Sequence, residues 1–343
     1  MRLAVVIPCF RAKSTILRVL AEIHPSVDRI YVVDDACPEG LGAFVQTESL
    51  DPRVLVIHLE QNSGVGGATI EGFRRAYQDG FDILIKIDAD HQMDSRLIPA
   101  FVEPIQNTKA DYVKGNRFFS PRSLRGMPLT RLIGNAGLSF LNKLSTGYWN
   151  MMDPTNGYIA IHRNLLPFLD IEKLEKRYFF ESDLLFRLGS MRAVVVDVPI
   201  WSRYADETSN LSVTGTLVSF PLKLLKRTVK RILYRYFLRD VNIATVLFLA
   251  GLILTCFGVV YGSYHWISSY QLMRPTNSGT VMLAALPVLL GIQMLLSALL
   301  YDVSSVPTTP IYPSLGNLLG DEKIFANQSQ QNGGAIPEPP VNT

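Results

Sequence analysis

The stretch "ILIKIDADHQMD", residues 83–94, joins an apolar run directly to three carboxylates, an imidazole and a carboxamide. The largely β-branched run 83–87 is typical of a strand buried on both faces of a sheet. Ligands of such sheets collect beyond the carboxyl ends of the strands, where Asp88 and Asp90 would lie. Two crowded carboxylates repel each other unless a cation lies between them, and oxygen ligands suit Mg²⁺ or Mn²⁺. The alternative is a solvated loop in which Asp94 caps the next helix.

Four apolar runs alternate with helix-like stretches in the first part of the chain. They are "LAVVIP" (3–8), "RIYVVDD" (29–35), "RVLVIHL" (53–59) and "DILIKIDAD" (82–90). This alternation predicts an α/β fold with a mainly parallel sheet. Because the second run also ends in paired acids, Asp34 and Asp35, we expect acids from neighbouring strands to line one cleft.

Three glycines precede a helical pattern in "NSGVGGATIEGFRRA", residues 62–76. Backbone amides at the start of a helix could approach a phosphate or a sugar closely, which makes Gly67 a candidate for ligand binding. The spacing fits neither the dinucleotide fingerprint nor a P-loop. A tight turn explains the glycines equally well.

Two long apolar segments lie near the C-terminus. Residues 243–267 and 279–301 contain no Asp, Glu, Lys or Arg, and each reaches the roughly 20 residues that a membrane-spanning helix needs. We therefore expect two transmembrane helices within residues 241–302. Buried helices of a soluble core are the alternative, but they rarely run so long without a charge. No signal peptide is visible, and the three cysteines lack the spacing of a disulfide framework, which suggests a reducing compartment.

The net charge of +3 is unevenly distributed. Between Thr208 and Arg239 there is no acidic residue, and apolar residues recur every three or four positions. The segment contains seven basic residues: Lys223, Lys226, Arg227, Lys230, Arg231, Arg235 and Arg239. This pattern predicts an amphipathic helix over residues 213–240 that lies among lipid headgroups and is attracted to anionic lipid. A nucleic-acid-binding patch is the disfavoured alternative, because the segment adjoins a membrane span.

The same basic flank predicts the orientation in the cell membrane. The positive-inside bias places it in the cytoplasm, together with the preceding domain, residues 1–212, and both termini of this multi-pass protein. The loop between the two spans then faces the outside. Residues 303–343 are rich in Pro, Asn, Gln and Gly and are expected to form a disordered tail.

A series of motifs, taken in order, resembles the family 2 glycosyltransferases with the GT-A fold. The motifs are "VVIPCF", "VVDDACPEG", "NSGVGGATIEGFRRA", "KIDADHQMD", "KGNRF" and "YFFESDLLFRL". The D-A-D with Gln at the next alternate position, the amphipathic helix and the two spans resemble the polyprenyl-phosphate glycosyltransferases, such as the dolichol-phosphate mannose synthases. The resemblance covers roughly residues 1–300. It implies a Rossmann-like nucleotide-diphosphosugar transferase domain and inverting transfer of one sugar to polyprenyl phosphate, giving a lipid-linked sugar for cell-surface glycan assembly.

The resemblance also assigns residues to the donor. It implies that Pro8 and Asp35 line the nucleotide base pocket and that Gly67 and Asp88 bind the nucleotide sugar. It further implies that a divalent metal, Mg²⁺ or Mn²⁺, is held by the side chains of Asp88, Asp90 and Gln92.

One departure from the family pattern concerns the nucleotide base. Relatives commonly read Tyr-Asn-Glu after the first strand, whereas this chain reads Phe10, Arg11 and Ala12. Loss of that acid favours a UDP-linked over a GDP-linked donor, although both stay open. The sugar is not specified.

The nature of the acceptor decides which side chains the reaction needs. Cleavage of a sugar-diphosphate bond needs positive charge on the leaving group, which a metal and Arg117 would supply. A hydroxyl acceptor needs a base, whereas a phosphate arrives ionised and needs cations instead. Cations cluster in one short segment: Lys114, Arg117, Arg122, Arg125 and Arg131. Arg131 is the candidate for holding the acceptor phosphate, and a basic surface loop is the alternative.

Three acids remain candidates near the acceptor. Asp153 aligns with an acid that polyprenyl members place near the acceptor and donor sugar. Glu181 and Asp183 align with the general base of hydroxyl-using members, although acids cap helix starts as a matter of routine. His91 is expected to be a loop residue. We favour the phosphate acceptor over a hydroxyl of a lipid-linked glycan and over a non-catalytic scaffold; a homo-oligomer stays possible.

Overall fold

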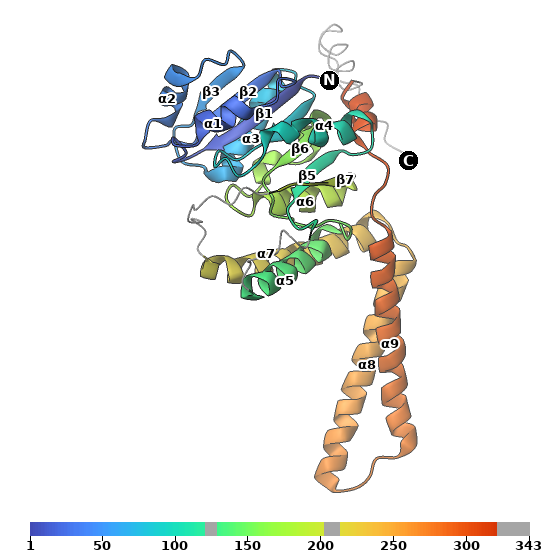
Figure 1. Ribbon diagram of the computed structural model, residues 1–343. Helices are drawn as coiled ribbons and strands as arrows, with labels where there is room; N and C mark the ends of the chain where they lie inside the picture. The colour runs from blue at the N-terminus through green and yellow to red at the C-terminus, as the bar shows by residue number, and fades with distance from the viewer. Residues whose placement is uncertain (121–128, 202–212, 321–343) are drawn as a thin grey trace, which may run out of the picture. The chain divides into compact units, whose positions relative to one another are not determined.

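The computed structural model describes residues 1–120, 129–201 and 213–320 (Figure 1). The chain divides into two compact units. The first comprises residues 1–139, 151–216 and 307–343, and the second comprises residues 140–150 and 217–306. The first unit contains the sheet, and the second contains the two long apolar helices.

A seven-stranded sheet forms the centre of the first unit. Its order is β3 (Val54–His58), β2 (Arg29–Asp34), β1 (Leu3–Cys9), β4 (Ile83–Lys86), β6 (Ile159–His162), β5 (Tyr112–Asn116) and β7 (Val195–Pro199). β1 pairs in parallel with both β2 and β4, whereas β6 is antiparallel to β4 and β5. The predicted α/β fold with a mainly parallel sheet is therefore confirmed. The antiparallel β6 is a feature that the alternation did not predict.

Helices accompany this sheet, and α2, α3 and α4 contact its strands. The helices are α1 (Ile16–Glu22), α2 (Leu41–Glu48), α3 (Gly64–Gln78), α4 (Ile98–Gln106), α6 (Phe180–Met191) and α5 (Leu129–Thr146), whose residues from 140 on belong to the second unit, with short 3-10 segments at Ser95–Leu97, Arg163–Phe168 and Ile171–Lys173. α3 contacts β1 and β2, and α4 contacts β5 and β6. In α3 the buried side chains of Ile70, Phe73 and Ala76 recur every three residues, as expected for a helix that packs one face on a sheet.

Part of the expected disordered tail is folded in the first unit. Residues 312–320 are helical, and the backbone N–H groups of Ile311 and Tyr312 donate to the buried carboxylate of Asp111 (2.9 and 2.7 Å). The Tyr312 ring stacks on His162 at 4.0 Å, and its hydroxyl donates to the Ile105 carbonyl (2.9 Å). The Tyr312 side chain and the buried Asp111 acceptor thus anchor this part of the tail. We call residues 307–320 the C-terminal segment; residues 321–343 lie outside the described part.

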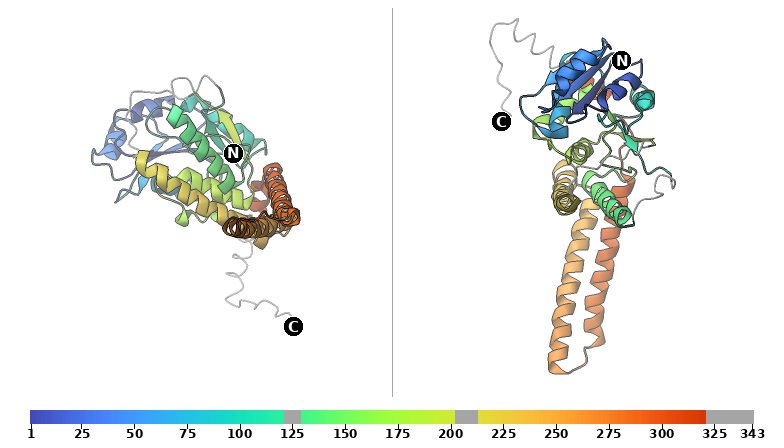
Figure 2. Two further views of the ribbon diagram at one scale, coloured as in Figure 1. Left: turned by 90° about the horizontal axis from the view of Figure 1, so that it is seen from below. Right: turned by 60° about the vertical axis from the view of Figure 1, so that its left-hand side comes forward.

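The second unit contains a helical hairpin. α8 (Ile243–Leu272) and α9 (Ser278–Ser304) lie side by side and antiparallel, joined by residues 273–277 (Figure 2). Both helices are long and apolar enough to span a membrane, and little of their apolar surface is buried. The core helix of a soluble protein would bury most of it. The two predicted spans therefore match two helices, although the loop between them is shorter than expected.

The predicted amphipathic segment is helical. α7 (Val213–Leu233) continues into a π-helical turn, Tyr234–Arg239. Leu222, Leu225 and Val229 are exposed at the expected spacing, whereas Leu224 is buried. Where side chains are described, α7 therefore presents an apolar stripe away from its packed face.

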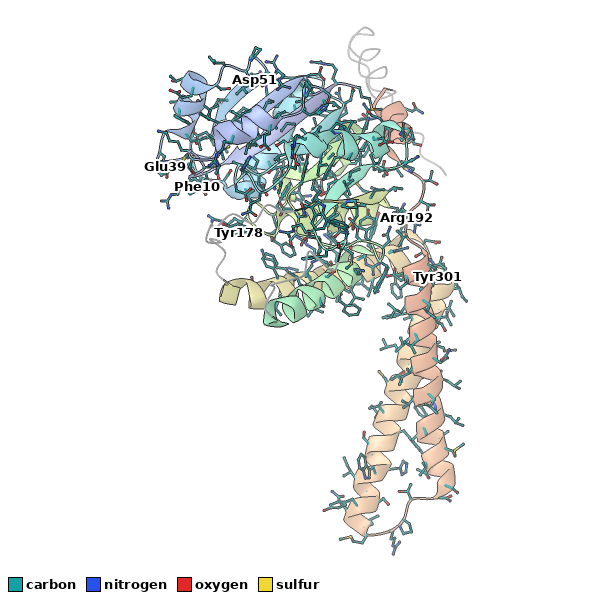
Figure 3. The ribbon with its side chains drawn as sticks, viewed as in Figure 1. Phe10, Glu39, Asp51, Tyr178, Arg192 and Tyr301 are labelled. Carbon is teal, nitrogen blue, oxygen red and sulfur yellow. The ribbon has the colours of Figure 1, made fainter. Side chains whose placement is uncertain are left out.

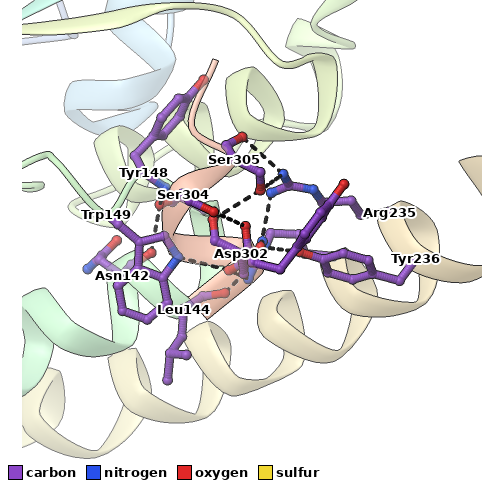
Figure 4. A network of polar contacts seen from close by, with 12 residues as sticks. Asn142, Leu144, Tyr148, Trp149, Arg235, Tyr236, Asp302, Ser304 and Ser305 are labelled. Carbon is purple, nitrogen blue, oxygen red and sulfur yellow. Dashed lines mark hydrogen bonds and ion pairs between the residues drawn. The ribbon is translucent and has the colours of Figure 1, made fainter. Parts of the chain in front are cut away.

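One basic side chain of this segment is not on the outer surface. Arg231 is only 3% exposed, and its two terminal nitrogens lie 2.9 Å from the carboxylate oxygens of Asp302, near the end of α9. Arg235, the Tyr236 hydroxyl and the Trp149 indole N–H also donate to Asp302 (Figure 4). We call these five residues the Asp302 cluster. Asp302 follows Arg231 by 71 residues and Arg235 by 67. The sequence around the basic segment therefore did not reveal the acid that pairs with it.

Candidate functional site

The predicted acids lie at one edge of the sheet. Because β1 is parallel to both β2 and β4, the carboxyl ends of these three strands meet there. Figure 3 shows Phe10 and Glu39, which follow β1 and β2, at one end of the sheet and Asp51, which precedes β3, at the other. Asp34 and Asp35, at the end of β2, therefore share an edge with Asp88 and Asp90, beyond β4. The expected grouping of the two acid pairs follows from this topology.

Asp34 and Asp35 both hold loops of the protein. Asp34 accepts the backbone N–H groups of Cys37 and Gly42, each at 2.9 Å. Asp35, which is 2% exposed, accepts those of Ser63 (2.6 Å) and Gly64 (2.9 Å) at the start of α3. The Asp35 carboxylate thus has an organising role, and its contact with a nucleotide base stays a prediction. Pro8 lies in β1, opposite Val33 of β2.

The glycines of the 62–76 segment let two parts of the chain approach closely. The Gly67 N–H donates to the Lys176 carbonyl at 3.0 Å, and a Cβ on Gly67 would lie 2.5 Å from the Ser63 hydroxyl oxygen. Gly64 has a φ of 81°, which favours glycine. The glycines are therefore explained by packing against the segment before α6, and donor binding by Gly67 stays a prediction.

The D-x-D loop is accessible. The side chains of Asp88, Asp90 and Gln92 are partly exposed, and Asp90 accepts the Gln92 backbone N–H at 3.0 Å. Among the described residues, no group of three or more His, Cys, Asp or Glu side chains could hold a metal ion unaided. Two carboxylates and one amide are hard oxygen donors that fit Mg²⁺ or Mn²⁺ when a substrate supplies the remaining ligands. The residues present therefore fit a metal that binds together with a diphosphate.

Two neighbours of this loop have structural partners. His91 has a positive φ of 62°, and its Nε2 lies 3.1 Å from a Glu22 oxygen, as suits a loop residue. Asp94 accepts the Arg96 N–H at the start of a 3-10 turn. The capping role that we considered for Asp94 is thus present beside the accessible acids.

Arg117 and Asp153 form a pair. Arg117 Nε and one terminal nitrogen donate to the two Asp153 oxygens at 2.7 Å each, and Asn156 donates a further bond at 2.9 Å. Asp153 is 1% exposed. Burial alone would raise the pKa of its carboxyl, but the Arg117 guanidinium outweighs burial and holds that pKa below its usual range. The structure thus joins two residues that the sequence assigned to different ligands.

Lys114 is not a surface cation. It is fully buried, its ammonium donates to the Met152 carbonyl, and it lies 3.3 Å from an Asp197 oxygen. Burial lowers the pKa of Lys114, although Asp197 opposes this shift. Lys114 therefore does not belong to a basic surface loop. Arg131 lies within α5, but its side chain, like Arg122 and Arg125, lies outside the described residues.

Glu181 and Asp183 lie in the first turn of α6 and are both buried. Glu181 Oε1 lies 3.0 Å from the Lys86 ammonium. Asp183 is 0% exposed and accepts the Glu175 backbone N–H at 3.1 Å. Both acids thus bind other parts of the protein, and neither is presented to solvent as a base.

Lys86 is the residue that sequence reasoning missed. It is the last residue of β4, is 0% exposed and lies 2.7 Å from Asp88 Oδ1. Burial alone would lower the pKa of Lys86, but Asp88 and Glu181 outweigh it and raise that pKa. A lysine within an otherwise apolar strand was the available signal, because a buried ammonium needs a carboxylate partner.

Comparison with known proteins supplies the family. Residues 4–168 match the model of glycosyl transferase family 2. The chain is 31% identical over 231 residues to the UDP-N-acetylglucosamine–dolichyl-phosphate N-acetylglucosaminyltransferase of Methanococcus voltae. This match covers 63% of the chain and 91% of the relative. The chain is also 31% identical over 204 residues to the undecaprenyl-phosphate mannosyltransferase of Micrococcus luteus. That match covers 58% of the chain and 83% of the relative.

A solved structure supports the fold. The glucosyl-3-phosphoglycerate synthase of Mycobacterium tuberculosis, crystallised with Mn²⁺, UDP and phosphoglyceric acid, superposes with a TM-score of 0.50. The match covers 67% of this chain and 78% of that one, with 19% sequence identity. At this identity the likeness concerns the fold alone, and it agrees with the GT-A arrangement of the sheet.

Proposed function

Because the chain belongs to glycosyltransferase family 2, we propose that it transfers one sugar, with inversion, from a nucleotide-diphosphate sugar to polyprenyl phosphate. Its relatives from Methanococcus voltae and Micrococcus luteus are named for transfer to dolichyl and undecaprenyl phosphate. Two helices that are long and apolar enough to span a membrane suit a lipid-linked acceptor. The product would be a lipid-linked sugar for glycan assembly.

The donor would bind at the carboxyl edge of the sheet. Asp88, Asp90 and Gln92 would hold Mg²⁺ or Mn²⁺ there, and the metal would supply positive charge to the leaving diphosphate. A protein of the same fold is crystallised with Mn²⁺ and UDP, which is in line with this role. The relative from Methanococcus voltae is named for a UDP-linked donor, which supports a uridine nucleotide. Pro8, Asp35 and Gly67 line the same edge through β1, β2 and the start of α3, so they remain our candidates for the nucleotide.

The state of Glu181 and Asp183 is the observation that supports a phosphate acceptor. A hydroxyl acceptor needs a base within hydrogen-bond reach of its proton. Glu181 is engaged by Lys86, and Asp183 is fully buried and engaged by the Glu175 N–H. A phosphate acceptor arrives ionised near neutral pH and needs neither residue as a base. The arrangement therefore favours polyprenyl phosphate over a hydroxyl of a lipid-linked glycan.

The C-terminal segment supports the proposed topology. Ser304 ends α9, and Ile311 is hydrogen-bonded to Asp111 of the sheet-containing unit. Seven residues of extended chain reach at most about 25 Å, less than the roughly 30 Å of a hydrocarbon core. We infer that α9 ends on the same side of the membrane as this unit, and that the basic flank of α8 places that side in the cytoplasm.

A transfer assay tests the proposed function. The purified full chain is incubated with radiolabelled UDP- or GDP-sugars and either polyprenyl phosphate or the matched polyprenol. We expect label in the organic phase with the phosphate only, released by mild acid as a glycosyl phosphate is. The Asp90→Asn variant is the matched control and should transfer little. Equal labelling of the polyprenol would favour the hydroxyl-acceptor reading, and no labelling with any donor would overturn the proposal.

A further inference from the structure

Lys86 joins two acids that lie 93 residues apart in the chain, Asp88 and Glu181. Its ammonium lies 2.7 Å from Asp88 Oδ1, 3.0 Å from Glu181 Oε1 and 3.3 Å from the Gly157 carbonyl oxygen. The ammonium is fully buried, so these contacts replace its hydration. Lys86 thus links the end of β4 to the first turn of α6 and to the chain that precedes β6.

The ammonium draws one Asp88 oxygen inward. Asp88 Oδ1 is buried 2.7 Å from the ammonium, a contact by charge that does not have hydrogen-bond geometry, whereas the Asp88 side chain as a whole retains 29% exposure. Because the ammonium is itself held by Glu181 and the Gly157 carbonyl, its attraction keeps Oδ1 buried, and Oδ2 is the oxygen that can reach a ligand.

Gly157 shows how closely this arrangement is packed. A Cβ at this position would lie 2.4 Å from Asp88 Oδ2 and 2.6 Å from the Lys86 ammonium. Even a methyl group would therefore displace both partners. The chain between Asp153 and β6 approaches the Lys86–Asp88 pair this closely only because residue 157 is glycine.

Resting on the proposed function, we propose that Lys86 is a positioning residue that orients Asp88 for the metal and the donor diphosphate. Its charge alone would act the other way, because a cation near a metal site weakens metal binding. If Lys86 orients Asp88, removal of the ammonium should lower the affinity for the metal. If only its charge matters, removal should raise that affinity. If Lys86 served only to neutralise the buried Glu181, metal affinity would rise or stay constant without it.

The test measures Mn²⁺ binding by the purified full chain in the presence of UDP, using the electron paramagnetic resonance signal of free Mn²⁺. We expect Lys86→Met to weaken binding by about 10- to 100-fold, the range for loss of a group that orients a metal ligand. Lys109→Met, which removes an exposed lysine, is the matched charge control and should leave binding unchanged. Tighter or unchanged binding in Lys86→Met would overturn the proposal.

Two further variants separate orientation from folding and from the partner acid. Lys86→Met with Glu181→Gln removes both charges, so recovery of wild-type affinity would mean that Lys86 only compensates Glu181. We expect the double variant to stay as weak as Lys86→Met. Gly157→Ala keeps every charge but displaces Asp88 and Lys86, and it should also weaken Mn²⁺ binding at least tenfold; unchanged affinity there would contradict the proposal even if Lys86→Met fails to fold. Since no acceptor is present, these results are independent of whether polyprenyl phosphate is the substrate.

Discussion

The Asp302 cluster gives a prediction that can be worked from the structure. Asp302 is 4% exposed and accepts hydrogen bonds from Arg231, Arg235, Tyr236 and Trp149. Asp302→Asn keeps the shape of the side chain but removes its charge. Arg231, which is 3% exposed, then faces a neutral amide with almost no water to solvate its guanidinium.

Asp302→Asn replaces a single oxygen atom by an NH₂ group, yet we expect it to lower the stability substantially. Removing one partner of a buried ion pair costs about 3–5 kcal/mol, because the remaining charge stays buried and unpaired. The unit that contains Asp302 has about 100 residues, and in a domain of this size each kcal/mol lowers the Tm by roughly 4–8 °C. We therefore expect the Tm of this unit to fall by at least about 12 °C.

Trp149 offers a direct readout of the cluster. In a Trp201→Phe, Trp266→Phe background the remaining indole donates to Asp302 at 2.8 Å, so its fluorescence follows melting of this site in detergent micelles. Asp240→Asn makes the same chemical change at an exposed carboxylate and should shift the Tm by less than about 2–4 °C. An Asp302→Asn shift no larger than that of the control would refute the reasoning.

Three further predictions concern the metal, the topology and the C-terminal segment. EDTA should abolish transfer and Mn²⁺ or Mg²⁺ restore it, with Asp90→Ala inactive though folded and Gln92→Ala milder; full activity in EDTA would remove the metal role. A single cysteine in place of Pro275 should react with an impermeant maleimide only from the extracytoplasmic side, and labelling from the cytoplasm would reverse the assignment. Burial lowers the pKa of His162 to about 4. Because this folded-state pKa lies below the unfolded value of about 6.5, the folded state keeps its full stability above pH 6.5. It loses up to about 3 kcal/mol of unfolding free energy as the pH falls toward 4. The protection factors of the Ile311 and Tyr312 amides, which correct for the slower intrinsic exchange at lower pH, should therefore fall between pH 7 and pH 5 more in the wild type than in His162→Asn, whose side-chain oxygen can still accept the Asn164 N–H. An equal fall in both proteins would contradict this prediction.

The fold was largely predictable because each of its signals is local. β1 to β4 were recognisable as apolar runs, and α8 and α9 as long segments without charge. The antiparallel direction of β6 was not predictable, because strand direction depends on how the connections cross the sheet. The order of the C-terminal segment was missed for a similar reason, since Tyr312 is ordered by Asp111 and His162 from distant parts of the sequence.

The candidate site was predictable in its residues but not in its pairings. Asp88 and Asp90 followed from their position after a buried strand. The partners of the charged groups lie far away in the chain: Arg117 from Asp153 by 36 residues, and Lys86 from Glu181 by 95. No periodic pattern connects such positions. A charge inside an apolar strand was the one local sign, and it indicates that a partner exists without indicating which one.

These pairings change what the donor diphosphate would need. Arg117 is engaged by Asp153, Lys114 by Asp197, and Lys86 by Asp88 and Glu181. These three cations are thus already balanced by carboxylates of the protein, so they offer less positive charge to phosphate than their number in the sequence suggests. The negative charge that develops on a leaving diphosphate must then be met largely by a cation that arrives with the donor, which is the role we assign to a metal held by Asp88, Asp90 and Gln92. This balance of charge supports the proposed metal dependence in addition to the D-x-D motif, and transfer that persists in EDTA would require Arg117 or Lys86 to leave its carboxylate during the reaction.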